Sequence, residues 1–269
     1  MISVIISTFN QPEWLDLVLF GYSCQTYRDF ELIVADDGSN ESTLEVIEKR
    51  KQEGLLSLKH VYHENKGFQK CTILNKAVLK SEGDYLIFSD GDIIPRKDFV
   101  QVHFNMRRTG RFLSGGTVRL PADLSARIGA GEIRSGICFD RTWLEDNGLG
   151  KSFKNNKLNA YGLKERFLNS FTPAGATWNG GNASAWKEDV IAVKGFDQRL
   201  LYGGEDREFG ERLERMGVKG KQIRYSAVTL HLDHPRDYVH LKEQQYNKQI
   251  RRQNRKNGII QTEYGLTIN

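Results

Sequence analysis

The sequence predicts an α/β protein built on a mostly parallel sheet that is flanked by helices. Two observations carry this prediction. Over the first ninety residues, short β-branched or apolar runs alternate with stretches of helical length, a pattern typical of βαβ units. Each run also ends in small or polar residues, and in a parallel sheet such strand ends line one edge, where ligands bind.

The predicted elements can be placed in chain order. We expect strands at 3–7, 30–35, 58–62 and 84–88, separated by helices at 13–22, 42–52 and 70–80. After residue 92 the pattern loosens: 95–109 indicates a helix, 112–117 a strand, and 122–171 is mixed and rich in glycine and asparagine. The stretch 147–159 fits no element and indicates a mobile loop near a site. Order returns with a strand that ends at Trp186 and a helix that begins at Glu205.

Composition limits the possible classes of protein. The 269 residues are enough for one large domain with its own core, and no apolar run approaches the roughly 20 residues that span a bilayer. Three widely spaced cysteines without a CxxC pair favour a reducing compartment and argue against a zinc site. Because the sequence shows no signal-peptide pattern, we expect a cytoplasmic protein.

The net charge of +5 arises in one segment. Residues 242–256 carry six lysines and arginines against one glutamate (6 − 1 = 5), so the rest of the chain is neutral overall. A nucleic-acid-binding protein usually spreads basic charge over a whole face, and we therefore expect no nucleic-acid partner. The segment suits peripheral contact with an anionic membrane or with a lipid-linked diphosphate acceptor, although a solvated terminal helix is the simpler explanation.

Acidic residues follow two of the predicted strands. Asp90-Gly91-Asp92 places two carboxylates one residue apart, which can hold Mg²⁺ or Mn²⁺ together with a diphosphate, although such a motif alone more often marks an ordinary turn. Asp36-Asp37-Gly38-Ser39 follows the strand 32–35. Its acids can accept hydrogen bonds from a ribose hydroxyl or an imide N–H, or simply form a capping turn, with Ser39 or Ser42 as the helix cap.

Together with residues 3–10, 23–39 and 65–75, these motifs resemble family 2 glycosyltransferases of GT-A fold over about residues 2–100. The resemblance implies a Rossmann-like nucleotide-binding sheet in which Ser7, Phe9 and Asp37 contact uridine, with Asp36 as their companion. It also implies that Asp90 and Asp92 bind the metal, with Gly91 between them at the donor. Position 74 is leucine where the family often has arginine, and Lys70 is the candidate that supplies the positive charge instead.

A second motif, Tyr202-Gly203-Gly204-Glu205-Asp206, opens the helix predicted at Glu205. Acids in a first helical turn are favoured by the helix dipole, which is the plain explanation. With 179–182 and 195–197, however, the stretch 178–235 resembles the catalytic region of galactosyltransferases and N-acetylgalactosaminyltransferases. This resemblance implies that Asp206 is the general base and Glu205 binds the acceptor, with Gly181 at the donor. A base at a helix start is expected to have a low pKa unless it is buried.

The late run 227–230 is followed by two histidines, His231 and His234. A histidine here is most often structural, but the resemblance implies that one completes the metal shell: His231 is the first candidate and His234 the fallback. Imidazole favours Mn²⁺ slightly over Mg²⁺. Arg236 is placed near the departing diphosphate. Of the tryptophans, most of which belong in a core, Trp178 is the one we place nearest the chemistry.

As a whole, the resemblance implies an inverting, metal-dependent transfer of a hexose or N-acetylhexosamine from a UDP-sugar to a glycan or lipid-linked saccharide. We expect a nucleotide-sugar-binding half at 1–110, an acceptor-binding half at 111–240 that shares the same sheet, and a basic C-terminal helix and tail at 241–269. Two alternatives stay open. A sugar-nucleotide nucleotidyltransferase normally has a basic glycine-rich loop after the first strand, where this chain has 9–12, and a non-catalytic nucleotide-sugar-binding module does not need Glu205-Asp206.

Overall fold

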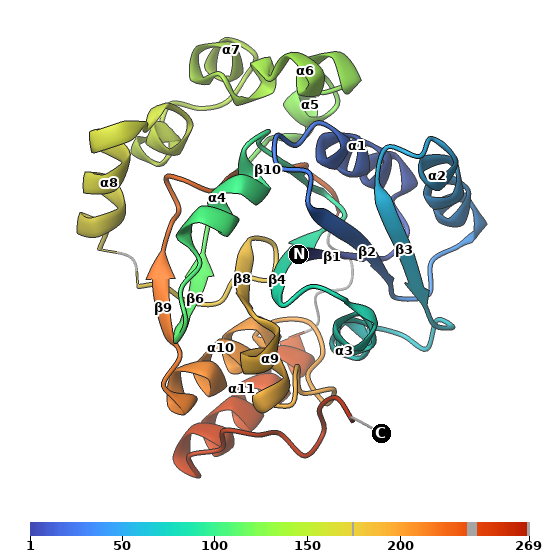
Figure 1. Ribbon diagram of the computed structural model, residues 1–269, viewed down its shortest axis with the longest axis vertical. Coiled ribbons are helices and arrows are strands. Elements are labelled where there is room, and N and C mark those ends of the chain that lie inside the picture. Colours follow the sequence, from blue (N-terminus) through green and yellow to red (C-terminus); the bar gives the residue numbers. More distant parts are fainter. Residues whose placement is uncertain (174, 236–240, 268–269) are drawn as a thin grey trace.

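The computed structural model of the protein describes residues 1–173, 175–235 and 241–267. Its centre is a seven-stranded sheet with the strand order β3-β2-β1-β4-β8-β6-β9 (Figure 1). Strands β3, β2, β1 and β4 are parallel to one another. Strand β8 is antiparallel to both of its neighbours, β4 and β6, and β6 is parallel to β9. The predicted α/β class with a mostly parallel sheet is therefore confirmed. The strands are β1 (Ile2–Thr8), β2 (Phe30–Asp36), β3 (Ser57–Tyr62), β4 (Tyr85–Asp90), β6 (Arg111–Ser114), β8 (Ala183–Trp186) and β9 (Lys219–Gln222).

Helices cover both faces of this sheet, because its strands are buried on both sides and alternate residues point to opposite faces. On one face, α1 (Pro12–Ser23) and α2 (Glu41–Gln52) pack on the even-numbered residues of β1. On the other face, α3 (Lys70–Lys80) packs on Ile5 and Ile33 together with α9 (Lys187–Ala192) and α10 (Glu205–Met216). All of the strands and helices predicted before residue 90 are present within two residues of their expected ends. Asn40, rather than Ser39 or Ser42, caps α2.

The chain between residues 93 and 119 differs from its prediction. The stretch 95–109 contains only a short helix, α4 (Phe99–Met106), which is preceded by the strand β5 (Ile93–Pro95). The single strand expected at 112–117 is two strands in two sheets, because the chain leaves β6 at Gly115 and enters β7 (Gly116–Arg119). β7 joins β5 and β10 (Val228–His231) in a second, three-stranded sheet. This small sheet brings the histidine end of β10 to the residues that follow β4.

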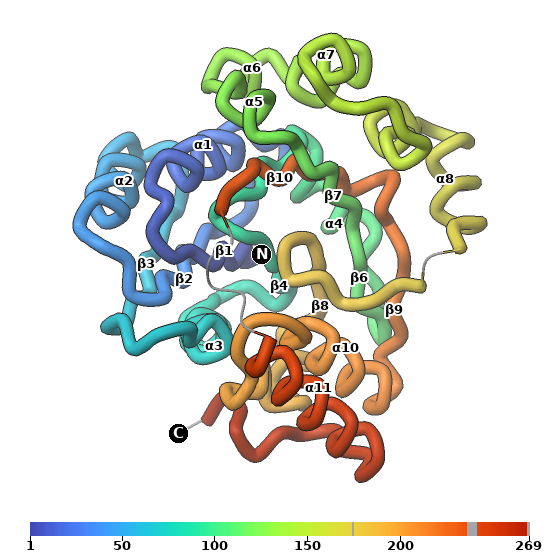
Figure 2. Tube along the Cα trace, turned by 180° about the vertical axis from the view of Figure 1, so that it is seen from behind, coloured from blue at the N-terminus to red at the C-terminus, as the bar shows by residue number. Residues whose placement is uncertain are grey.

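A ridge of short helices crosses the edge of the molecule between residues 122 and 171 (Figure 2). Residues 153–159, which are part of the stretch expected to be a mobile loop, form a 3-10 helix. The ridge consists of α5 (Ala122–Ser125), α6 (Ala130–Ser135), η1 (Ile137–Phe139), α7 (Arg141–Asp146), η2 (Phe153–Asn159) and α8 (Gly162–Phe171). At the opposite end of the molecule, the basic helix α11 (Leu241–Lys256) packs on α10. None of the helices in the described ranges is long and apolar enough to cross a membrane.

Candidate functional site

The carboxyl ends of β1, β2 and β4 lie side by side at one edge of the large sheet. In the register of the sheet, Ser7 is paired with both Ala35 and Asp90, and Thr8 is paired with Asp36. Phe9 follows β1 and is 47% exposed. The next two residues, Asn10 and Gln11, have left-handed backbone angles; Asn10 donates its N–H to the Ser39 hydroxyl, and its side-chain oxygen accepts the Asn40 N–H. The strand ends therefore form a continuous polar rim, as the sequence predicted.

Asp36 and Asp37 are both buried and each contacts a histidine. Asp36 hydrogen-bonds His60 at 3.0 Å, and Asp37 hydrogen-bonds His63 at 2.6 Å and accepts the Gln69 N–H at 2.9 Å. Burial raises the pKa of Asp37. For Asp36 burial acts in the same direction, but the hydrogen bonds from His60 and Ser39 outweigh it and lower the pKa.

The two histidines were not predicted as site residues. Their signal is positional: β3 is the neighbour of β2, and His60 is paired with Val34, two residues before Asp36. Side chains near the end of β3 therefore reach the acids that end β2.

Asp90 is held by residues from two other elements. Its Oδ1 atom accepts a hydrogen bond from the Ser7 hydroxyl at 2.6 Å and from the Lys70 ammonium at 2.7 Å. Burial would disfavour the charge on Lys70, but the carboxylates of Asp90, Asp206 and Glu205 raise its pKa. Lys70 therefore stays a cation. Gly91 donates its N–H to the Ser7 carbonyl at 2.8 Å, and an alanine Cβ there would lie 2.9 Å from the Thr8 hydroxyl.

Three of the four predicted metal ligands lie together. The carboxylate of Asp92 is 2.9 Å from His234 Nε2 and 3.6 Å from His231 Nε2, and one ligand atom from each residue lies within 4.8 Å of the others. The Leu232 N–H donates to the Asp92 carbonyl at 2.9 Å, which fixes the end of β10 against the Asp-Gly-Asp turn. Asp90 is not in this group, because Ser7 and Lys70 hold its carboxylate. Arg236 lies outside the described residues.

These three residues fit a divalent cation. One carboxylate and two imidazoles are a donor set that suits Mn²⁺ and similar ions. The second oxygen of Asp92 is buried and has no hydrogen-bond partner within the described part of the chain. A buried carboxylate oxygen without a partner is unfavourable unless a proton or a cation satisfies it.

Glu205 and Asp206 begin α10 after two glycines in left-handed conformations, Gly203 (φ 97°) and Gly204 (φ 111°). Glu205 accepts the Gly203 N–H at 2.8 Å and so caps its own turn. Asp206 accepts the Gly180 N–H at 3.0 Å, and its other oxygen is buried without a partner among the described residues.

Burial, together with the negative charge of Glu205, raises the pKa of Asp206 to about 7, although Lys70 opposes the shift. The low pKa that a helix start alone favours is therefore not observed, because burial outweighs the helix dipole. A carboxylate with a pKa near neutrality can accept and release protons under physiological conditions.

Gly180 and Gly181 lie between the two acidic centres. An alanine Cβ at Gly180 would be 2.5 Å from Asp206 Oδ1, and one at Gly181 would be 2.9 Å from Asp90 Oδ2 and 2.4 Å from the Ile93 side chain. Only glycine permits the backbone to pass this close to both carboxylates. The Gly-Gly pair thus places Asp206 and Asp90 on opposite sides of one short segment.

Helix α11 supports the loop that carries Glu205 and Asp206. The Asn247 side chain donates to the carbonyls of Leu201, Tyr202 and Gly203, at 2.8, 3.3 and 3.0 Å, and accepts the Leu201 N–H at 3.3 Å. This role was not predicted, since the charge of residues 242–256 was the only feature interpreted from the sequence. The signal was the spacing of Asn247, Ile250 and Asn254, which form the buried stripe of the helix.

Two residues in or beside the predicted motifs are structural. Trp178, the tryptophan expected nearest the chemistry, is 2% exposed and packs between Phe88, Phe112 and Phe209, so its side chain belongs to the core. Asp197 of the 195–197 motif is buried and bonded to Arg199 and Thr262.

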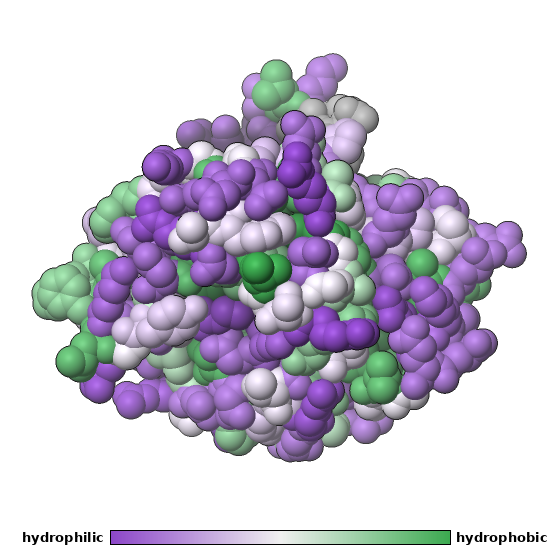
Figure 3. Space-filling model, turned by 90° about the horizontal axis from the view of Figure 1, so that it is seen from above, coloured by the Kyte–Doolittle hydropathy of each residue, from purple (hydrophilic) through white to green (hydrophobic). Residues whose placement is uncertain are grey.

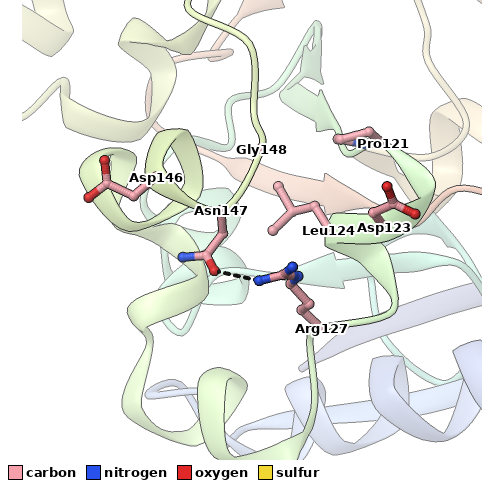
Figure 4. Close-up of a pocket in the computed structure, with 7 residues that line it drawn as sticks. All are labelled: Pro121, Asp123, Leu124, Arg127, Asp146, Asn147 and Gly148. Atoms are coloured by element: carbon pink, nitrogen blue, oxygen red, sulfur yellow. Dashed lines mark hydrogen bonds between the residues drawn. The ribbon is translucent and has the colours of Figure 1, made fainter.

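Two surface hollows are lined by none of the predicted site residues. Figure 4 shows the one between α5 and the end of α7, about 370 Å³ in volume, in which Arg127 donates to the Asn147 side chain at 3.2 Å. The other, about 390 Å³, lies between α9 and residues 261–267. The chemistry is concentrated instead where β1, β4, β10 and α10 end.

The sheet order, the acidic turn after β4 and the histidines at and after the end of β10 are the arrangement of the GT-A fold of glycosyltransferases. Residues 3–119 match the model for glycosyl transferase family 2. Residues 168–241 match a second model, described as the N-terminal domain of galactosyltransferase.

Similar proteins of known name include chondroitin synthase from Escherichia coli, which is 27% identical over 244 residues and 87% of this chain. Validoxylamine A glucosyltransferase from Streptomyces hygroscopicus subsp. jinggangensis is 26% identical over 81% of this chain. The chain spans only 35% and 52% of the length of these two relatives.

Solved structures share the fold. The S. aureus TarS 1-349 complex with UDP-GlcNAc has a TM-score of 0.63 at 16% identity, and the match covers 93% of this chain and 65% of the TarS chain. A mannosyltransferase from Pyrobaculum calidifontis in complex with GDP-Man and Mn²⁺ has a TM-score of 0.59 at 18% identity, covering 93% of this chain and 60% of that chain.

Proposed function

We propose that the protein transfers a hexose or N-acetylhexosamine from a UDP-sugar to a hydroxyl of a glycan or lipid-linked acceptor, with a divalent cation and with inversion at the anomeric carbon. The observation that carries the proposal is the position of Asp206. Its side chain is half-buried, with one carboxylate oxygen shielded from solvent, and its pKa is about 7. It lies in the same polar cluster as Lys70 and Asp90, and α3, β4 and α10 bring these residues together. Polysaccharide synthesis is consistent with the likeness to chondroitin synthase, and a UDP-N-acetylhexosamine donor with the likeness to the TarS complex.

The donor side of the reaction follows from the rim residues. We assign Ser7, Phe9, Asp36 and Asp37 to the nucleoside, with Gly91 and Gly181 giving the diphosphate close access to the backbone. Asp92, His231 and His234 hold the cation, and Mn²⁺ or Mg²⁺ bound there would stabilise the charge that develops on the leaving diphosphate. Lys70 adds a positive charge beside Asp90. Because Asp90 is hydrogen-bonded to Lys70 and Ser7, we assign it to positioning the Lys70 ammonium group.

The acceptor side depends on Asp206 and Glu205. Asp206 takes the proton of the acceptor hydroxyl while that oxygen forms a bond to the anomeric carbon. The bond from this carbon to the diphosphate oxygen breaks at the same time, and the diphosphate leaves with the electron pair. A single displacement from the opposite face inverts the configuration. Glu205, at the start of the same helix, orients the acceptor.

The division into a donor side and an acceptor side gives a role to each part of the chain. Residues 1–110 form the donor half and 111–240 the acceptor half of one domain, and 241–269 carry the basic helix. The exposed charges of α11 suit an anionic acceptor or membrane surface by electrostatic attraction.

The test is a panel of UDP-, GDP- and dTDP-sugars, with binding and nucleotide release measured in Mn²⁺ and in EDTA. We expect one UDP-sugar to bind and to release UDP slowly in Mn²⁺ only. Binding without turnover, even with a broad acceptor mixture, would favour the binding-module alternative, and failure to bind any nucleotide would contradict the assignment of the rim.

Three variants separate the roles. Asp92→Ala should weaken donor binding in Mn²⁺ but not in EDTA. Asp206→Asn should nearly abolish transfer while donor affinity stays within a few-fold. Asp146→Asn, an exposed acid on α7, is the matched control and should change neither.

A further inference from the structure

Helix α8 is attached to the protein with its apolar side facing outward. All ten of its residues are described, and none of them is buried. Leu163, Phe167 and Phe171 recur every four residues, so they lie on one face of the helix. Leu163 is 83% exposed and Phe171 is 71% exposed, and the rings of Phe167 and Phe171 contact each other with centroids 4.5 Å apart. An amphipathic helix in a globular protein normally buries this face.

The polar face of α8 makes the contacts with the body of the protein. The Asn169 side chain accepts the Tyr225 N–H at 3.0 Å and donates to the Ser226 hydroxyl at 2.8 Å. The Ser226 hydroxyl in turn donates to the Glu165 carboxylate. These bonds attach two successive turns of α8 to the residues that precede β10. They fix the rotation of the helix about its axis, and the apolar face is therefore held toward solvent.

Further aromatic and basic side chains extend this surface. Phe153 and Tyr161 are exposed, as are Lys151, Lys154, Lys164 and Arg166. Residues 151–171 carry five lysines and arginines and one glutamate, a net charge of 5 − 1 = +4. Figure 3 shows apolar side chains projecting at the left edge of the molecule, the side on which α8 lies in Figure 1, with hydrophilic side chains around them.

The charge of this surface identifies its partner. Exposed aromatic and aliphatic residues flanked by lysines and arginines are the pattern of helices that lie in the interface of an anionic bilayer. A second copy of the chain is disfavoured, since a two-fold interface would bring the same +4 surface of both copies together. Helix α11 differs, because its Ile250 is buried and its two exposed apolar residues, Leu241 and Tyr246, lie among polar and charged ones.

We propose that residues 151–171 form a membrane-docking face, in which Leu163, Phe167 and Phe171 enter the boundary between headgroups and acyl chains of an anionic bilayer. The exposed lysines and Arg166 contact the headgroups around them. This inference does not depend on the transfer reaction, because it rests only on the contacts, exposure and charge of α8 and its neighbours.

The test is co-sedimentation of the full chain with vesicles of phosphatidylcholine alone or mixed with phosphatidylglycerol. We expect binding to the mixed vesicles that weakens with salt, and little binding to phosphatidylcholine alone. The double variant Leu163→Gln/Phe171→Gln should bind the mixed vesicles at least tenfold more weakly. Leu55→Gln, which changes another exposed leucine (61% exposed) before β3, is the matched control and should bind like wild type.

A second variant distinguishes α8 from the basic helix. Lys248→Glu/Arg252→Glu reverses two exposed charges of α11 and should reduce binding less than the α8 double variant. The proposal is wrong if the α8 variant binds like wild type, or if only the α11 variant loses binding. It is also overturned if the α8 variant instead abolishes a concentration-dependent dimer in sedimentation equilibrium, which would make this face a contact between two copies. Thermal unfolding of each variant establishes that it is folded.

Discussion

The rate of transfer should fall about tenfold when the pH is lowered from about 8 to about 6, because Asp206 must be ionised to act as a base. Its pKa of about 7 follows from burial and from the nearby charges of Glu205 and Asp90, opposed by Lys70 and the Gly180 N–H. With this pKa, about ten elevenths of the carboxylates are ionised at the higher pH and about one eleventh at the lower. An aspartate with an ordinary pKa would be ionised at both, and the rate would not change.

The assay is the initial rate of nucleotide release from the preferred donor at saturating Mn²⁺, measured across this pH range. The decisive variant is Glu205→Gln, because it changes the charge next to Asp206. Removing this negative charge should move the midpoint of the normalised profile to lower pH, whereas Glu214→Gln, an exposed acid in the last turn of α10, should leave it in place. The assignment of Asp206 is refuted if the Glu205 variant keeps the wild-type midpoint.

Three further predictions concern the supports of the site. Gly180→Ala should reduce transfer at least tenfold with little loss of stability, because the added Cβ would displace the Asp206 carboxylate. Gly131→Ala is the control and should be active, since a Cβ there meets no atom within 4 Å. Equal transfer rates for the two variants would contradict the close approach of Gly180 to Asp206. Asn247→Ala should lower the free energy of unfolding by about 2 kcal/mol, measured in urea, since it leaves three partly buried carbonyls without their donor. A change below a few tenths of a kcal/mol would mean that the loop keeps its conformation without Asn247. The buried His103 has a pKa lowered from 6.5 to about 4, so the unfolded chain binds a proton below 6.5 that the native state does not. Stability should therefore be complete above this pH and fall as the pH drops to 4, by up to about 3 kcal/mol, and His103→Gln should flatten this dependence in urea titrations.

The parts of the fold that the sequence predicted are those that depend on local patterns. Strands β1, β2 and β4 are short, apolar and buried on both faces, whereas β3 is a partly exposed edge strand. Helices α1 to α3 each have regular apolar spacing, so the positions of these elements follow from periodicity. The acidic turns were found for the same reason, because each follows a clear strand. The grouping of Asp92 with His231 and His234, in contrast, was expected from the family resemblance, since no local pattern connects residues so far apart in the chain.

The predictions that failed depend on distant residues. The break between β6 and β7 occurs where the side chain of Asn182 packs against Gly115 and donates to the Gly116 carbonyl at 3.2 Å, 66 positions away. Trp178 was expected to be the tryptophan nearest the chemistry, but its ring is enclosed by aromatic residues from three other elements. His60 was overlooked because its meaning comes only from the pairing of β3 with β2.

The clamp of α11 on the Tyr202–Gly203 turn has a consequence for the synthesis of the protein. Asn247 lies 44 positions after Gly203, so a growing chain can form β1 to β4 and most of the sheet well before this asparagine has been made. Until then the carbonyls of the turn lack their donors, and the start of α10 is not held at the site. A ribosome-bound chain with a finished donor half should thus be able to bind a nucleotide before it can use one. Competence for the reaction would arise only after α11 has been made and has docked on the turn.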